Sequence, residues 1–187
     1  MRISECDVLI LPGLNNSGDD HWQSRWESRL GSASRVLQED WNNPDPSGWV
    51  DQLEKAVASA TRPVVLVAHS LGVLTVAQAA PRLGGERIIG AFLVAPPDPE
   101  QAGDVPEPIA AFSPVPTAPL PFPSLLVASR NDPYCSFERA QEIALDWGSA
   151  LVDAGEAGHI NSDSGHGPWP EGLMRLGAFL GKLSKAA

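Results

Sequence analysis

The stretch PVVLVAHSLGVLTVAQAAPRL, residues 63–83, joins an unbroken apolar run to an apolar helical segment and places a serine between them. Residues 63–68 show no alternation of polar and apolar side chains, which is typical of a central parallel strand covered on both faces. Ser70 therefore lies at the carboxyl end of a strand. Catalytic groups gather at such ends in open α/β sheets.

Short β-rich runs alternate with helical segments along the rest of the chain. Further strands are expected at 7–12, 34–38, 87–96, 124–129 and 150–154. Helices are expected with Trp22, Trp26 and Leu30 on one face, from Pro46 onward, over 137–147, and from Pro170 through Leu180. This alternation predicts an α/β fold, with one domain over residues 1–187 and a mostly parallel six-stranded sheet.

Composition excludes several classes of function. The 187 residues carry a formal net charge of −10, which argues against nucleic-acid binding because that draws on clustered Lys and Arg. No apolar run approaches a membrane span, and the first residues lack the apolar core of a signal peptide. Cys6 and Cys135 make neither a disulfide framework nor a zinc site. We expect a cytoplasmic protein without a cofactor, a bound metal or a membrane partner.

AHSLG, residues 68–72, matches the nucleophile-elbow pattern G-x-S-x-G except that Ala68 replaces the first glycine. Small residues are needed because the turn is tight and the flanking backbone comes close. The alternative is that Ser70 only caps the following helix. Its position between an apolar strand and an apolar helix favours a nucleophile.

A serine nucleophile needs a base beside it, and the chain order in α/β-hydrolases is serine, acid, histidine. Asp132 follows the strand expected at 124–129, so it is the preferred acid. The alternative for Asp132 is an Asx-turn residue that caps its own loop. The rival acids are Asp98, Asp153 and Asp163.

The base is expected in the loop after the last strand, AGHINSDSGHGPWPEG, residues 157–172, which holds His159 and His166. His159 is still close to the carboxyl edge of the sheet, whereas His166 comes where the chain turns toward its last helix. A base must reach the serine hydroxyl within hydrogen-bond distance. We therefore expect His159 to be the base and His166 to be a loop or pocket-rim residue.

An oxyanion site also needs backbone donors. One is expected to be the N–H of Leu71, and the second should come from the loop after the first strand. In that loop Leu14 is the first candidate and Asn15 the next. His21, which follows in the same loop, is a candidate for the mouth of the pocket.

Ten of the 18 prolines lie within residues 96–123. Long connections of this kind are often lids or binding loops. A stiff surface crossover explains the composition equally well, and both interpretations remain open.

The sequence resembles the YdeN-like and retinoblastoma-binding protein 9 family of small serine hydrolases, within the α/β-hydrolase superfamily. The matching stretches are ILPGLNNSGDDHWQSRWE (10–27), VLVAHSLG (65–72), LPFPSLLVASRNDPY (120–134) and AGHINSDSGHGPWPEG (157–172). The resemblance implies an α/β-hydrolase core without a large cap domain and a Ser70–Asp132–His159 triad. Helices are then expected on both faces of the sheet.

These observations predict a serine hydrolase, carboxylesterase-like in its favoured form, that cleaves a small ester, thioester or amide through an acyl-enzyme. The rival hypothesis is a protein-binding module that keeps a hydrolase shell without physiological catalysis. The resemblance supports this rival because one family member is named after a partner protein.

Overall fold

The computed structural model describes residues 2–83, 86–101 and 105–186. Within them six strands form one sheet in the order β2-β1-β3-β4-β5-β6, and all their pairings are parallel. The strands are β1 (Asp7–Leu11), β2 (Ala33–Arg35), β3 (Val64–His69), β4 (Ile88–Val94), β5 (Ser124–Ala128) and β6 (Ala150–Asp153). The expected α/β fold with a six-stranded parallel sheet is confirmed.

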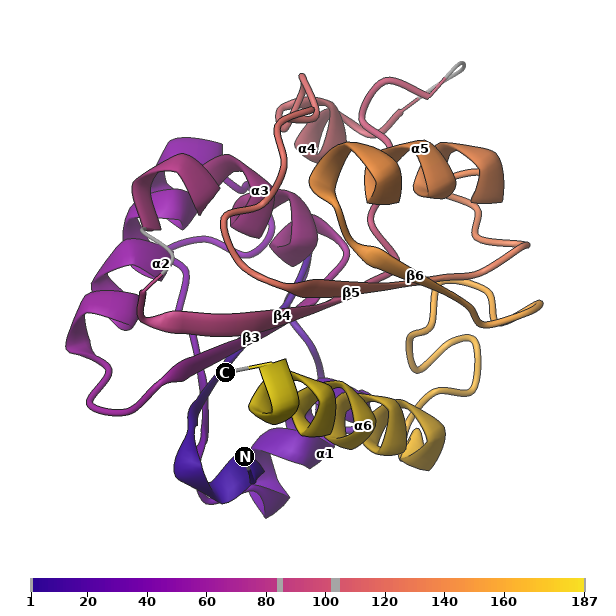
Figure 1. Ribbon diagram of the computed structural model, residues 1–187. Helices are drawn as coiled ribbons and strands as arrows, with labels where there is room; N and C mark the ends of the chain where they lie inside the picture. Colours follow the sequence, from indigo (N-terminus) through magenta and orange to yellow (C-terminus); the bar gives the residue numbers. More distant parts are fainter. Residues whose placement is uncertain (1, 84–85, 102–104, 187) are drawn as a thin grey trace.

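Helices cover both faces of this sheet (Figure 1). One face carries α1 and α6, and the other carries α2, α3 and α5. The bounds are α1 (Trp22–Arg29), α2 (Pro46–Ser59), α3 (Leu71–Leu83), α4 (Glu107–Ala110), α5 (Phe137–Trp147) and α6 (Pro170–Ala186), with a 3₁₀ turn, η1 (Ile3–Glu5), before β1. None of the helices in the described ranges is both long enough and apolar enough to cross a membrane.

The central strand β3 divides its side chains between two apolar cores. Val64, Leu66 and Ala68 face the core beneath α2, α3 and α5. Val65 and Val67 face the core beneath α1 and α6, and all five side chains are buried. Because both faces are covered, the strand is apolar throughout rather than alternating.

The second strand is shorter than the expected 34–38. It pairs with β1 at the edge of the sheet, and its partners are Val8, Leu9 and Ile10. The N–H of Val36 still donates to Ile10 O at 2.9 Å. Since β1 ends at Leu11, the chain then leaves the sheet, and Leu37 is 71% exposed. The other strands differ from expectation only at their ends.

The strand order reverses between β1 and β3, because β2 and β3 lie on opposite sides of β1. Ligands bind beyond the carboxyl ends of the strands at such a reversal. The buried side-chain amide of Gln23, in α1, links β1 and β3 at this position. It donates to Leu11 O at 3.0 Å and to Val67 O at 3.2 Å. The start of α1 is therefore tied to both strand ends.

The first turn of α3 lies directly against the end of β1. A Cβ atom at Gly72 would come within 2.3 Å of Leu11 O and 2.8 Å of Pro12 O. A Cβ at Gly13 would come within 2.7 Å of Ser70 Cβ. Glycine at both positions allows the backbone of the loop after β1 to approach the serine turn closely.

His21 begins α1 as a neutral cap. Its Nδ1 accepts the N–H of Gln23 at 3.2 Å. Burial, followed by the positive charge of Arg35, lowers the pKa of His21 to about 4. The imidazole therefore stays uncharged near neutral pH, as an acceptor at a helix N-terminus requires.

We expect Gly72→Ala to lower the free energy of unfolding by about 1–3 kcal/mol, because the added methyl group overpacks the contact with β1. The matched control is Gly177→Ala in α6, where an added Cβ would have no neighbour within 4 Å. That variant should gain roughly 0.5–1 kcal/mol from helix propensity alone. Urea unfolding of both variants measures the difference. Equal stability of the two would contradict the proposed contact.

We also expect the folded protein to lose stability as the pH falls from 6.5 toward about 4. In this window the unfolded chain binds a proton at His21 that the folded chain excludes. The loss from this residue reaches about 3 kcal/mol, at about 1.4 kcal/mol for each pH unit between the two pKa values. His21→Asn keeps a capping side chain and removes the titration, so its unfolding free energy should depend less steeply on pH. The difference between the unfolding free energies of the two proteins at neutral pH gives the effect of the cap alone. If the two unfolding free energies change with pH in parallel, the assignment of this pH dependence to His21 is refuted.

Candidate active site

Ser70 lies in a strained turn between β3 and α3. Its backbone φ is +55°, a left-handed conformation that residues other than glycine rarely adopt. The turn is held by hydrogen bonds from Ser70 N–H to Val94 O (3.1 Å) and from Val73 N–H to Ser70 O (2.8 Å). Ala68, at the position where the elbow pattern has glycine, is a fully buried β3 residue paired with Leu11 and Leu93. A methyl group therefore fits this position.

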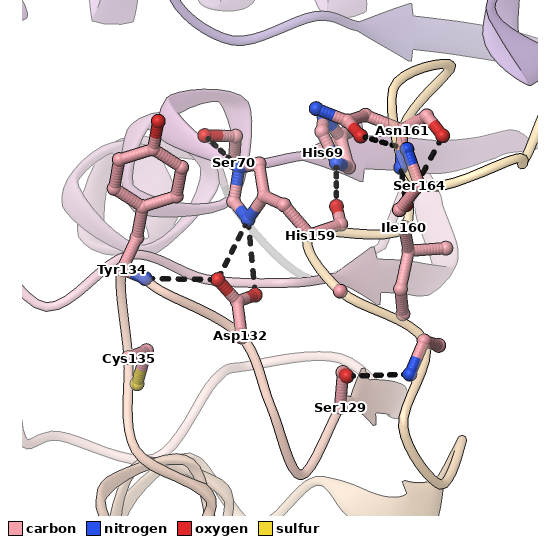
Figure 2. A network of polar contacts seen from close by, with 12 residues as sticks. His69, Ser70, Ser129, Asp132, Tyr134, Cys135, His159, Ile160, Asn161 and Ser164 are labelled. Carbon is pink, nitrogen blue, oxygen red and sulfur yellow. Dashed lines mark hydrogen bonds and ion pairs between the residues drawn. The ribbon is translucent and has the colours of Figure 1, made fainter.

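A chain of hydrogen bonds runs from Ser70 through His159 to Asp132 (Figure 2). His159 Nε2 lies 3.0 Å from Ser70 Oγ. Its Nδ1 lies 2.9 Å from Asp132 Oδ2 and 3.0 Å from Oδ1. The Asp132 side chain is only 3% exposed. The structure thus brings together the three side chains that the sequence singled out as nucleophile, base and acid.

The loops that carry Asp132 and His159 are fastened to each other by polar contacts. Asn131 Oδ1 accepts the N–H of Gly158 at 2.7 Å, and Ser129 Oγ accepts the N–H of Ala157 at 2.9 Å. The N–H of Arg130 donates to Gly155 O at 2.7 Å. These contacts fix the distance between acid and base. Sequence reasoning missed Ser129 and Asn131, although both stand in the short polar run that leads to Asp132.

Tyr134 supports the same pair from the other side. Its N–H donates to Asp132 Oδ1 at 3.0 Å. Its ring meets the His159 ring edge to face, with the centroids 4.6 Å apart. Tyr134 therefore restrains both the carboxylate and the imidazole, and it too was missed from the sequence.

His69 holds the backbone of the base. It points toward the His159 loop and not toward the Ser70 hydroxyl (Figure 2), and its Nε2 lies 2.8 Å from His159 O. Because a carbonyl oxygen only accepts, this nitrogen carries the proton. Burial, followed by the neighbouring His159, lowers the pKa of His69 well below the usual value. His69 is a neutral donor that orients the loop.

The rival acids lie elsewhere. Asp153 pairs with Arg130 at 2.6 Å, and Asp98 lies 3.7 Å from the guanidinium of Arg139. Asp163 lies on the surface of the cavity and has no hydrogen bond to His159. Among the four candidates, Asp132 is the one that contacts the imidazole.

Of the two loop residues proposed to supply the second oxyanion donor, Leu14 suits the role and Asn15 does not. The N–H of Asn15 already donates to Trp41 O at 2.8 Å, so its backbone is unavailable. The N–H groups of Leu14 and Leu71 have no acceptor among the described residues. A Cβ at Gly13, next to Leu14, would lie 3.1 Å from Ser70 Oγ, which places this backbone beside the hydroxyl.

A cavity of about 290 Å³ opens onto Ser70 and His159. Leu14, Asn15 and His21 line it. The residues that complete the lining are Gly13, Asn16, Gly18, His69, Pro106, Ile109, Tyr134, Asn161, Ser162 and Asp163. Pro106 and Ile109 belong to the proline-rich segment 96–123, which therefore forms part of the wall. Residues 102–104 of that segment lie outside the described ranges.

His166 is not among the described residues that line this cavity. Its N–H donates to Asn161 O at 2.9 Å, and its Nδ1 lies 3.1 Å from Ser164 Oγ. Its ring packs edge to face against Trp169, with the centroids 6.0 Å apart. These contacts hold His166 within its own loop. In the described part of the chain, no group of three or more His, Cys, Asp or Glu side chains is placed to hold a metal ion.

Comparison with known proteins agrees with this geometry. A model of the serine hydrolase family matches residues 8–178. A YdeN-like hydrolase from Pectobacterium atrosepticum is 40% identical, with a TM-score of 0.85 over 97% of this chain and 94% of that chain.

More distant structures share the fold. The ydeN gene product of B. subtilis is 20% identical, with a TM-score of 0.72 over 94% of this chain and 99% of that chain. The RedJ thioesterase of the prodiginine pathway in Streptomyces coelicolor is 17% identical, with a TM-score of 0.64 over 96% and 90% of the two chains. A search of curated proteins found no match. On the family match and the 40% identity, the chain belongs to the serine hydrolase family, as a YdeN-like small hydrolase of the α/β-hydrolase superfamily.

Proposed function

We propose that Ser70, His159 and Asp132 act as the catalytic triad of an enzyme that hydrolyses a small carboxylic ester, thioester or amide. The observation that carries this proposal is the hydrogen-bonded chain that ends on Ser70 Oγ, in a strained turn open to a cavity. Strained backbone of this kind clusters at sites of chemistry. Carboxylic esters are the favoured substrates because a structure that shares the fold is an esterase, esterase 2 of Thermogutta terrifontis.

The tautomer of His159 follows from its partners. An ionised carboxylate only accepts hydrogen bonds, so Nδ1 carries the proton that faces Asp132. Nε2 is then an acceptor directed at the Ser70 hydroxyl at 3.0 Å. This arrangement lets His159 take the hydroxyl proton as Oγ attacks a carbonyl carbon, while Asp132 stabilises the imidazolium that forms.

The tetrahedral intermediate places a negative charge on the former carbonyl oxygen. The N–H groups of Leu14 and Leu71 are the proposed donors to this oxyanion, because both are free and both lie beside Ser70. His159 then gives its proton to the leaving alcohol, thiol or amine, and an acyl-Ser70 ester remains. Water, activated by the same imidazole, attacks the ester and releases the acid.

The cavity favours a short acyl group. Its volume of about 290 Å³ lies at the lower end of the range for small-molecule sites. Ile109 and Pro106, from the proline-rich segment, close one side. We therefore propose short-chain substrates and assign Pro106 and Ile109 to the wall of the acyl site.

A fluorophosphonate probe should label the wild-type protein at Ser70 and leave Ser70→Ala unlabelled. With a short-chain p-nitrophenyl ester, His159→Ala should lower kcat by about 10⁴–10⁶, as removal of a triad base does in other serine hydrolases. His166→Ala should keep most of the activity, because His166 contacts Trp169 and not Ser70. Circular dichroism checks that each variant is folded. Folded wild-type protein that neither labels nor turns over esters faster than Ser70→Ala would favour the protein-binding hypothesis instead.

A further inference from the structure

We propose that this active site selects its substrates by charge, preferring a cationic acyl group to a neutral one and rejecting anionic ones. The inference rests on the proposed hydrolase function and names the substrate class of the same site. It follows from the charged groups of the described residues in and around the cavity: the arginines named below are paired with acids, and the lining holds an unpaired carboxylate.

The cavity lining contains no lysine or arginine. Its two non-reacting histidines, His21 and His69, are neutral, since burial lowers the pKa of His21 to about 4 and that of His69 well below the usual value. A carboxylate or phosphate in this cavity would therefore meet no resident positive charge. Hydrolases that bind anionic acyl groups need such a charge, because burying an unpaired anion is costly.

The arginines of the surrounding segments are already paired with acids. Arg35, which donates to the lining residue Asn16, has Glu27 at 2.7 Å. Arg25 of α1 has Asp20 at 2.7 Å. A cation held by a carboxylate offers little attraction to an incoming anion.

The arginines near the loop after β5, which carries Asp132, are also paired with acids. Arg130 pairs with Asp153 at 2.6 Å. Arg139, at the start of α5, has Glu100 and Glu142 each at 3.1 Å. With a formal net charge of −10 for the whole chain, the long-range field also repels anions.

Among the described residues of the lining, Asp163 supplies the unpaired carboxylate. It is exposed, and no described residue forms an ion pair or hydrogen bond with it. It follows His159 by four positions on the same loop. Because Asp163 lines the same cavity as His159, its charge would attract a positive group on an acyl chain bound there.

The loop keeps Asp163 in this place without using its side chain. The N–H of Asn161 donates to Ser164 Oγ at 3.0 Å, and the N–H of Ser164 donates back to Asn161 Oδ1 at 3.0 Å (Figure 2). A Cβ at Gly158 would lie 2.7 Å from Ser164 Cβ, so this turn packs closely on the backbone before His159. The position of the Asp163 backbone is thus fixed while the carboxylate stays free.

The test uses three p-nitrophenyl esters whose acyl chains have equal length and end in a trimethylammonium, a tert-butyl or a carboxylate group. For the wild-type protein we expect kcat/KM to be about fivefold higher for the cationic ester than for the neutral one, and about tenfold lower for the anionic one. One charge–charge contact in a partly hydrated site has this order of effect.

Asp163→Asn should remove the advantage of the cationic ester, and Asp163→Lys should invert the order of the three esters. Because Asp163 lines the cavity, kcat/KM of each variant for the charged esters is compared with the value of the same variant for the neutral ester. The matched control is Asp146→Asn on α5, a half-buried acid outside the lining, which should keep the wild-type order. Equal rates for the three esters, or an order that Asp163→Lys leaves unchanged, would overturn charge selection.

The neutral ester separates this inference from the proposed function. If wild-type protein hydrolyses it and Ser70→Ala does not, the hydrolase assignment stands whatever the charged esters do. If the neutral ester is not hydrolysed, the proposed function itself fails, and charge selection fails with it.

Discussion

The contact between the first turn of α3 and the end of β1 determines the geometry of the site. Gly72 allows this contact, since any Cβ there would overlap the carbonyl oxygens of Leu11 and Pro12. With α3 this close to β1, the chain between β3 and α3 has no room for a relaxed turn. Ser70 takes up the strain with a φ of +55°. The strain therefore presents the hydroxyl at the reversal of strand order, where the loop after β1 is also present.

Two further loops reach that point because they are tied to each other. The acid loop after β5 and the histidine loop after β6 come from neighbouring parallel strands. Ser129 and Asn131 join them through backbone N–H groups of the histidine loop. The distance from Asp132 to His159 is thus set by the backbone as well as by the hydrogen bonds between the two side chains. In the proposed reaction this preorganises the base and lowers the cost of orienting it.

The surroundings of His159 are polar but carry almost no free charge. His21 and His69 are held neutral by burial, one as a helix cap and the other as a donor to His159 O. In the proposed mechanism, neutral neighbours leave the His159 imidazolium free of like-charge repulsion at neutral pH. The same neutrality leaves Asp163 as the dominant charge that a substrate would meet in the lining.

The sequence by itself determined the architecture, because each strand run and each helical face is a local pattern that survives in the fold. The apolar run before Ser70 predicted a central buried strand, and the order of Ser70, Asp132 and His159 singled out three residues that the structure places in contact. The edge strand was expected at 34–38 but spans Ala33–Arg35. Its end depends on where its partner β1 ends, and the local sequence pattern does not contain that information.

Only the tertiary structure decided which backbone groups are free and which loops meet. Asn15 was a reasonable donor in sequence, yet its N–H is taken by Trp41 O, a residue far along the chain. The contacts that Ser129 and Asn131 make with the histidine loop were not foreseen either. These contacts share one physical reason: a hydrogen bond between distant loops depends on where the sheet places those loops, and sequence spacing does not contain that distance.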